Sequence, residues 1–266
     1  MRILQLLLLA FISTMASFAI SSARETGFLN RFVTLDGVEY RYQVFVPREY
    51  SPDKKWPVIL FLHGSGERGS DGLLQTEFGL PFEVRRNVSR FPCIVVLPQC
   101  PDGKIWMGTS ATMALAALDS AMKEFNGDEA RIYCTGLSLG GQGTWYLAAQ
   151  HPDKFAAIVP VCGPIRILKQ HPITPDIPES TLAIVHAPDP FGTIARRVAK
   201  IPIHIFHGDS DDVVPVSDSR TMVAELKKLG ADVQYTEYPG VKHPAWEKAY
   251  ADSAMIQWLF SQKRKH

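Results

Sequence analysis

Five consecutive residues, Gly136-Leu137-Ser138-Leu139-Gly140, have the spacing of a nucleophile elbow, a tight strand-to-helix turn that exposes a serine hydroxyl. Both glycines suit such a turn, because backbone segments approach closely there and leave no room for a Cβ. A short β-prone run, 132–135, precedes the motif, and a helical pattern over 142–150 follows it. Ser138 is therefore predicted to be a nucleophile; the alternative is a helix-capping serine in a glycine-rich turn.

A serine hydroxyl is a weak nucleophile at neutral pH, so Ser138 needs a general base that is itself oriented by a carboxylate. After a nucleophile elbow, the expected chain order is serine, then the acid, then histidine. Only two of the eight histidines, His243 and His266, follow the aspartate-rich loop 207–212. His266 is the last residue of a charged tail, so His243 is the predicted base.

Three aspartates, Asp209, Asp211 and Asp212, follow the predicted strand 201–206. Asp211 is the preferred acid, because the pattern Gly208-x-x-Asp211-x-x-Val-Pro places it where this type of loop usually presents its carboxylate. Asp212 is the alternative. The remaining aspartates are expected to cap the loop or to face solvent.

A tetrahedral intermediate carries an oxyanion, and each of two preorganised backbone donors is worth roughly 3 kcal/mol of barrier. The N–H of Leu139, directly after the nucleophile, is the expected first donor. The glycine-rich loop 63–69 follows a buried apolar strand and supplies the second, for which Ser65 is chosen and Gly66 is the neighbouring alternative. No metal or cofactor is required by this chemistry.

Several residues beside these motifs have two interpretations. His63 and His207 each precede a glycine at the end of a predicted strand, and for both we favour hydrogen bonding that holds the loop over a catalytic role. Glu67 and Arg68 are expected to pair with each other. Trp106 and Trp246 are candidate walls of the cleft, although buried tryptophans more often belong to the core.

The remaining pattern predicts a mostly parallel sheet with helices on both faces, opened by an antiparallel hairpin at Asp36-Gly37. Helices are expected over 73–86, over 109–125 with Thr109 or Ser110 as N-cap, and as one continuous element over 245–260. The predicted strands cover 31–35, 38–46, 57–62, 93–97, 132–135, 155–161, 201–206 and 233–238.

The segment 163–200 interrupts this alternation of strands and helices. It contains six prolines, too many for a single helix, in a long connection between two predicted core strands. Connections of this length often form lids or substrate-binding walls, and a surface excursion without function is the alternative. We therefore treat 163–200 as a candidate lid.

The N-terminal residues have the layout of a secretory signal: Met1-Arg2, an apolar run over 3–12, and small residues over 13–23. Cleavage is expected after Ser21-Ser22-Ala23, which leaves a mature domain over 24–266; Ser17-Phe18-Ala19 is the second candidate site. The apolar run is short for a spanning helix, so no stable membrane anchor is expected. These features predict a secreted or periplasmic protein.

Composition limits the other function classes. The chain has 266 residues, 46% of them hydrophobic and 21% charged, which suits one large α/β domain. Its formal net charge of +1 argues against nucleic-acid binding, which usually needs a basic face. The four cysteines, Cys93, Cys100, Cys134 and Cys162, lack the close pairing of a zinc site. Export makes disulfides possible, but free buried thiols are favoured.

The motifs FLHGSGERG, PQCPDGKIW, CTGLSLGGQGTW, HGDSDDVVP and GVKHPAW together resemble the α/β-hydrolase superfamily. In particular, they are similar to its secreted esterase branch, which includes polyhydroxybutyrate-depolymerase-like proteins, feruloyl and acetylxylan esterases, and predicted peptidases related to prolyl oligopeptidase. The likeness covers roughly residues 38–260. By position it implies Ser138 as nucleophile, Asp211 as acid, His243 as base, and Ser65 and Leu139 as oxyanion donors.

This resemblance implies a secreted serine carboxylesterase without cofactor, whose substrate is a small ester or an acetyl or feruloyl ester of plant polysaccharide. The alternatives are a serine peptidase or amidase, and a hydrolase-like binding protein without activity. Action on insoluble polyester or lipid is a weaker alternative that would need exposed aromatic residues near the cleft. The length of 163–200 departs from the short link expected in this branch, which leaves the substrate open.

Overall fold

The computed structural model describes residues 25–169, 171 and 173–264. The predicted signal peptide therefore lies outside the described residues. Eight strands form one sheet in the order β1-β2-β4-β3-β5-β6-β7-β8. The strands are β1 (Gly27–Leu35), β2 (Val38–Val46), β3 (Trp56–Leu62), β4 (Ile94–Pro98), β5 (Gly127–Leu137), β6 (Ala157–Val161), β7 (Ile203–Gly208) and β8 (Val233–Tyr238).

The first two strands are antiparallel to each other, and β2 is antiparallel to β4, whereas the neighbours from β4 to β8 all pair in parallel. The predicted fold class is therefore confirmed: a mostly parallel sheet that begins with antiparallel strands. In the β1–β2 hairpin, Leu35 pairs with Val38 around the turn at Asp36-Gly37, where both residues have positive φ. In a parallel sheet the loops after β3, β5, β7 and β8 gather at one edge, which brings the predicted site residues together.

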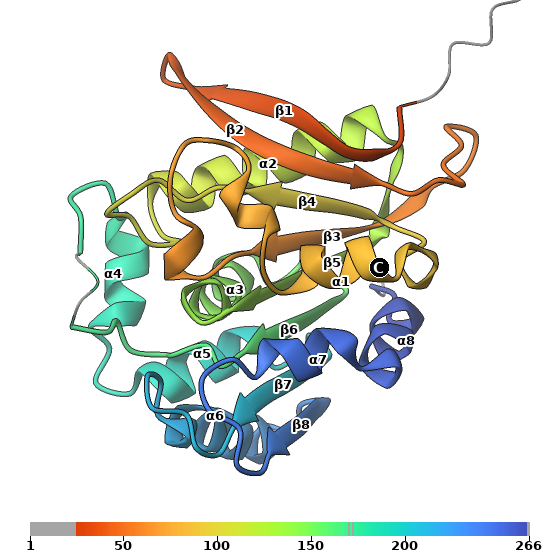
Figure 1. The fold of residues 1–266 in the computed structure, drawn as a ribbon. Helices are drawn as coiled ribbons and strands as arrows, with labels where there is room; N and C mark the ends of the chain where they lie inside the picture. Colours follow the sequence, from red (N-terminus) through yellow and green to blue (C-terminus); the bar gives the residue numbers. More distant parts are fainter. Residues whose placement is uncertain (1–24, 170, 172, 265–266) are drawn as a thin grey trace, which may run out of the picture.

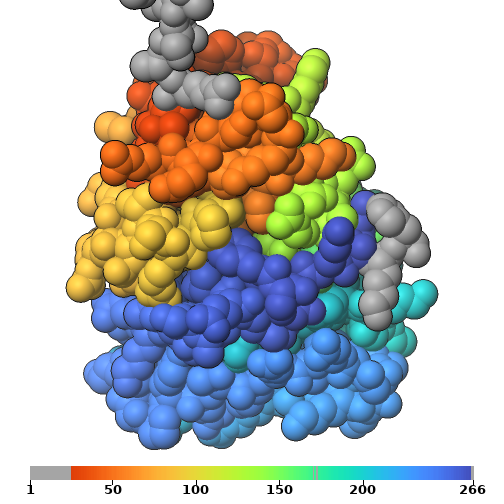
Figure 2. All heavy atoms as spheres, turned by 90° about the vertical axis from the view of Figure 1, so that its right-hand side faces the viewer, coloured from red at the N-terminus to blue at the C-terminus, as the bar shows by residue number. Residues whose placement is uncertain are grey.

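Helices cover both faces of this sheet (Figure 1). The described helices are α1 (Leu80–Arg86), α2 (Thr109–Glu124), α3 (Leu139–Gln150), α4 (Glu179–Val185), α5 (Pro190–Val198), α6 (Val216–Lys228), α7 (Trp246–Ala251) and α8 (Ser253–Ser261). Two separate buried clusters show which helices share a face. One joins the sheet to α2, α3, α5 and α6, and the other joins it to α1, α7 and α8. Figure 2 shows the C-terminal segment, in dark blue, packed between other parts of the chain.

Two predicted helices are interrupted in the structure. The stretch 73–86 is helical only from Leu80, after a 3-10 turn at Leu74–Thr76, because Gly79 between them has φ +72°. The final stretch 245–260 forms two helices rather than one. Asp252 is extended, with ψ 111°, and its carboxylate accepts a hydrogen bond from the N–H of Ala254, which starts α8.

The N-cap predicted for α2 is also wrong. The N-cap residue is Gly108, at φ 57°, and no side chain of its own turn caps the helix. Instead the carboxylate of Asp176 accepts a hydrogen bond of 3.0 Å from the N–H of Thr109 and one of 2.8 Å from Nζ of Lys104. A residue of the segment 163–200 therefore caps a helix of the main domain.

The segment 163–200 contains two helices that its prolines begin rather than break: Pro178 precedes α4, and Pro190 is the first residue of α5. The helix α5 buries Ile194, Ala195 and Val198 and contacts α3 and α6. It is thus the crossover helix between β6 and β7. Most of the irregular part of the connection precedes α5, and a short turn over 199–202 follows it.

Among the described residues, no helix is both long and apolar enough to cross a membrane. All four cysteines are buried free thiols, as favoured from the sequence.

Candidate active site

Ser138 lies in the turn between β5 and α3, with φ 52° and ψ −115°. A non-glycine residue in this region of backbone space is strained, and such strain is typical of a nucleophile elbow. The flanking glycines permit the turn: a Cβ on Gly140 would lie 1.8 Å from the carbonyl oxygen of Leu62, and one on Gly136 would lie 2.3 Å from that of Gly140. The packing of β3 against the start of α3 therefore depends on both glycines.

His243 contacts the Ser138 side chain directly. Its Nε2 lies 2.9 Å from Oγ of Ser138, and its Nδ1 lies 2.8 Å from Oδ2 of Asp211. Because the carboxylate can only accept, Nδ1 carries the proton and Nε2 is left as an acceptor for the serine hydroxyl. This arrangement lets Nε2 take up a proton from Ser138 while the carboxylate stabilises the resulting imidazolium.

Asp211 has a completely buried side chain that accepts four hydrogen bonds. Its Oδ1 accepts from the backbone N–H groups of Val213 and Val214, at 2.8 and 2.9 Å, and its Oδ2 from His243 and from Nε2 of His207, at 3.1 Å. Burial by itself would raise the pKa of Asp211, but the hydrogen bonds from the two histidines and the backbone outweigh it and hold the pKa well below its usual value. Asp211 therefore stays ionised through the neutral and mildly acidic range.

The other two aspartates of this loop lie apart from His243. Asp212 is exposed, and its carboxylate is 3.4 Å from Nζ of Lys242. Asp209 accepts hydrogen bonds from the N–H of Gly240 and the hydroxyl of Ser210, both at 2.8 Å. Both positions agree with the loop-capping or solvent-facing roles expected for them.

His207 contacts the carboxylate of Asp211, a contact that the sequence did not predict. It is fully buried in β7, with Nδ1 2.7 Å from Oγ of Ser219 and Nε2 3.1 Å from both Asp211 Oδ2 and the carbonyl oxygen of Val214. The favoured interpretation, a histidine that holds its loop by hydrogen bonding, matches these contacts. The spacing of four residues between His207 and Asp211 was the only signal in the sequence that they might meet.

The loop after β3 is held in place by His63, which is buried and hydrogen-bonded on both ring nitrogens. Its Nε2 accepts from the N–H of Cys100 at 2.9 Å, so Nδ1 carries the proton and donates to the carbonyl oxygen of Gly64 at 2.6 Å. Trp106 donates its indole N–H to the carbonyl oxygen of His63 at 2.9 Å. Burial lowers the pKa of His63 to about 4, so the ring is neutral at physiological pH.

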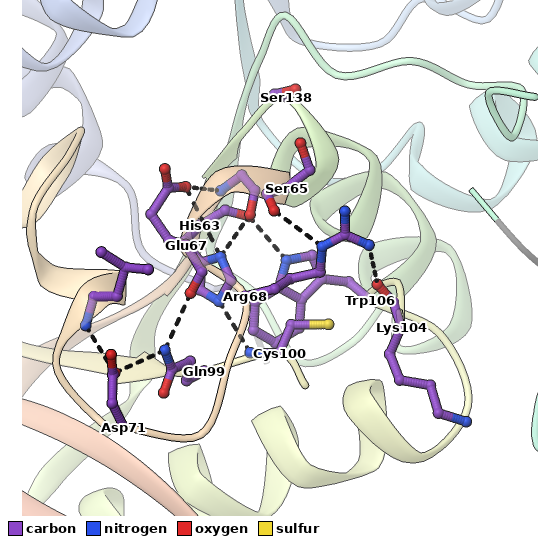
Figure 3. A network of polar contacts seen from close by, with 12 residues as sticks. His63, Ser65, Glu67, Arg68, Asp71, Gln99, Cys100, Lys104, Trp106 and Ser138 are labelled. Atoms are coloured by element: carbon purple, nitrogen blue, oxygen red, sulfur yellow. Dashed lines mark hydrogen bonds and ion pairs between the residues drawn. The ribbon is translucent and has the colours of Figure 1, made fainter. Parts of the chain in front are cut away.

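Figure 3 shows Ser65 and Ser138 near each other at one side of this network. Ser65 begins a 3-10 turn, and Leu139 is the first residue of α3. The predicted oxyanion donors thus lie in two different turns, Ser65 in the one after β3 and Leu139 directly after Ser138 in the one after β5. Their assignment as donors stays a prediction.

The expected ion pair between Glu67 and Arg68 does not form. The carboxylate of Glu67 accepts from the N–H of Gly64 at 2.9 Å, whereas Arg68 donates to the carbonyl oxygens of Ser65 and Lys104 at 2.9 and 3.2 Å. The reason is geometric: in the 3-10 turn Glu67 faces back toward the start of its own loop, and Arg68 faces the next loop (Figure 3). Each side chain braces the turn that contains Ser65.

The two tryptophans proposed as cleft walls differ. Trp106 is 1% exposed and belongs to the core. Trp246 is partly exposed and meets the His243 ring edge to face, with ring centroids 5.2 Å apart. Only Trp246 therefore lies beside the site.

One group of side chains of metal-ligating type occurs among the described residues: Cys162, Asp211 and His243, with ligand atoms within 4.8 Å of one another. Two of these residues already bond to each other, and burial raises the pKa of the Cys162 thiol, which keeps the thiol protonated. The group is therefore poorly suited to hold a metal ion.

The sheet order, the strained serine turn and the loops that meet it define an α/β-hydrolase. Residues 109–263 match the prolyl oligopeptidase family, and the chain belongs to that family. A solved structure described as a thermostable esterase superimposes with a TM-score of 0.72 at 34% identity, over 89% of this chain and 63% of the other.

Two relatives extend the comparison. An uncharacterised secreted protein of Arthroderma benhamiae is 31% identical over 73% of this chain, but the matched region spans only 22% of that protein's length. Feruloyl esterase B of Thermothelomyces thermophilus is 25% identical over 84% of this chain and 82% of its own length.

Proposed function

We propose that this protein is a serine ester hydrolase that works through an acyl-enzyme on Ser138. The observation that carries the proposal is the chain of hydrogen bonds from Ser138 through His243 to Asp211. Similarity to proteins described as esterases supports ester rather than amide bonds as the substrate.

In the proposed reaction, Oγ of Ser138 attacks the ester carbonyl while Nε2 of His243 takes up its proton. The backbone N–H groups of Ser65 and Leu139 stabilise the oxyanion of the tetrahedral intermediate. His243 then returns the proton to the leaving alcohol, which departs and leaves the acyl group on Ser138. Water, deprotonated by the same histidine, releases the acid. No metal or cofactor takes part.

The proposed natural substrates are acetyl or feruloyl esters of plant polysaccharide, cleaved outside the cytoplasm. The described relatives include a secreted protein and a feruloyl esterase, and the N-terminal sequence has the layout of a secretory signal. An exported enzyme can reach a polymeric substrate that does not enter cells.

A serine peptidase or amidase is the second candidate, favoured by membership of the prolyl oligopeptidase family. The same three residues would perform that chemistry, so geometry does not distinguish the leaving groups. A short acyl aryl ester and a peptide anilide, offered to the same preparation, separate the two candidates. Preference for the ester supports the proposal, whereas comparable rates on both would favour the peptidase.

The experiment that tests the proposal is a rate panel on purified protein: aryl acetate, methyl ferulate, acetylated xylan and a peptide anilide, each beside Ser138→Ala. We expect ester hydrolysis to fall by about a million-fold in the variant. The melting temperature should change little, because alanine removes one hydrogen bond, that to His243, and no apolar group. Activity that survives in Ser138→Ala would refute the nucleophile assignment. If no substrate is hydrolysed and a serine-directed phosphonate does not label Ser138, the result would support a binding protein without activity.

A further inference from the structure

A groove between α1 and α7 reaches Trp246, the tryptophan that packs against His243. It has a volume of about 410 Å³, and its lining includes Phe78, Phe82 and Trp246. The two helices contact each other and lie on the same face of the sheet (Figure 1). Trp246, at the start of α7, packs edge to face against the ring of His243. Trp246 therefore belongs both to the lining of the groove and to the surroundings of His243.

Two of the residues of α1 that line the groove reverse the burial pattern of a surface helix, in which apolar side chains are buried and charged ones are exposed. In α1, the phenylalanine Phe82 is 47% exposed, while Glu83 beside it is buried. Phe78, just before the helix, is 53% exposed. Isolated exposed apolar residues are common, but large apolar side chains that gather in one groove mark a binding surface. These aromatic side chains lie at the surface rather than in the core, and the guanidinium of Arg86, which also lines the groove, lies over the ring of Phe82 at 5.4 Å from its centroid.

The groove also has unpaired acceptors. The carboxylates of Glu77 and Glu247 line it, and neither side chain has a hydrogen-bond or ion-pair partner among the residues that the structure describes. Glu83, by contrast, accepts a hydrogen bond from Asn87 at 3.0 Å and lies 3.7 Å from Arg90. Aromatic surface and free carboxylate oxygens thus occur together.

The chemistry of the leaving group assigns this groove to one part of the substrate. The proton that His243 receives from Ser138 must pass to the oxygen of the leaving alcohol, so that alcohol departs next to the imidazole. Trp246 contacts the same imidazole. Of the two parts of the ester, the alcohol is thus the one that leaves from the imidazole against which Trp246 packs.

We propose that the groove between α1 and α7 binds the alcohol part of the substrate, and that this alcohol is a neutral sugar unit. A sugar ring has an apolar C–H face that packs on aromatic rings, and hydroxyl groups that donate to carboxylates. A polyester or lipid chain would instead bury the carboxylates of Glu77 and Glu247 without hydrogen bonds, which is costly. The inference rests on the proposed ester hydrolase and specifies its leaving group.

The test compares two acetate esters that differ only in the alcohol: acetylated xylo-oligosaccharide and ethyl acetate. Both form the same acetyl-enzyme, so the deacylation step is shared, and a difference in kcat/KM reports on the alcohol. The variant is Phe78→Ala/Phe82→Ala, which removes two half-exposed aromatic side chains. Phe32→Ala, with a 60% exposed ring on β1, is the matched control.

We expect kcat/KM for the sugar ester to fall by about 10-fold for each aromatic ring removed, mainly through KM, and to change by less than about two-fold for ethyl acetate. Phe32→Ala should leave both values unchanged. Equal losses on both esters, or no loss on the sugar ester, would overturn the proposal.

A third ester, octyl acetate, tests whether the groove binds an apolar alcohol instead of a sugar. If octyl acetate, rather than the sugar ester, loses activity in the double variant, the groove binds an apolar alcohol and the sugar assignment is wrong. If wild-type protein hydrolyses ethyl acetate through Ser138 but not the sugar ester, the inference fails while the ester hydrolase stands. If Ser138 supports no ester hydrolysis at all, the proposed function itself fails.

Discussion

Replacement of Asp211 by asparagine tests the assignment of the acid, because every group around this carboxylate is a donor. Oδ1 accepts from two backbone N–H groups of the loop, and Oδ2 accepts from His243 and His207. An asparagine has one oxygen and one NH₂ group. With its oxygen on the backbone donors, its NH₂ faces both histidines.

This orientation preserves the fold but inverts the proton pattern. Nδ1 of His243 must now accept, so the proton moves to Nε2, which faces Oγ of Ser138 and no longer takes up its proton. By the precedent of serine triads, kcat/KM should fall about 10⁴-fold, which corresponds to about 5.4 kcal/mol of transition-state stabilisation. The loss of charge-assisted hydrogen bonds should lower the free energy of unfolding by only about 1.5 kcal/mol.

The assay is hydrolysis of an aryl acetate at pH 7.5, together with the urea midpoint of each protein. Asp212→Asn is the matched control, since its side chain is exposed and pairs only with Lys242 at 3.4 Å. We expect it to keep nearly full activity. If Asp212→Asn lost more activity than Asp211→Asn, or if Asp211→Asn stayed within about ten-fold of wild type, the reasoning from donor geometry would be refuted.

Three further predictions concern the elements around the site. The pKa of His63 is lowered to about 4, below its unfolded value of about 6.5. The neutral ring therefore contributes about 3 kcal/mol to the free energy of unfolding above pH 6.5, and this contribution is lost as the pH falls toward 4. As the pH falls from 6.5 to 4, the urea midpoint should fall less steeply in His63→Gln than in the wild-type protein. The same slope of midpoint against pH in both proteins would contradict this. Gly140→Ala should lower the melting temperature far more than Gly66→Ala, because a Cβ would meet backbone only at Gly140. Asp176→Ala should cost about 1 kcal/mol in thermal unfolding by uncapping α2, and no loss would mean that Thr109 finds another acceptor.

The parts of the fold that the sequence predicted well depend on local pattern. The strand Val233–Tyr238 and the hairpin at Asp36-Gly37 follow from β-rich runs and turn residues that are adjacent in the chain. The three candidate site residues were chosen because chain order and strand ends restrict where a serine, an acid and a histidine can meet. The structure brings Ser138, Asp211 and His243 to hydrogen-bond distance.

What could not be predicted depends on contacts between distant segments. Nothing near Thr109 in the chain indicates that Asp176 would cap α2, and the periodicity of 245–260 continues across Asp252, where the helix breaks. The predicted ion pair between Glu67 and Arg68 was wrong for a related reason, because each side chain bonds to a backbone group instead. Adjacent opposite charges suggest a pair, but the 3-10 turn separates them and offers each a backbone partner instead.

The helix α1 shows how a failed local rule can locate function. An amphipathic helix is expected to bury its apolar side chains and expose its charged ones, and α1 does so at Leu80 and Val84 but not at Phe82 and Glu83. Such conflicts cost stability, and where they persist they tend to coincide with functional sites. Trp246 reaches the same groove from a distant part of the sequence and contacts His243, so the exposed Phe82 shares a groove with a residue that packs against the predicted base. In the proposed complex, the sugar ring would cover the exposed side chain of Phe82 and offset this cost.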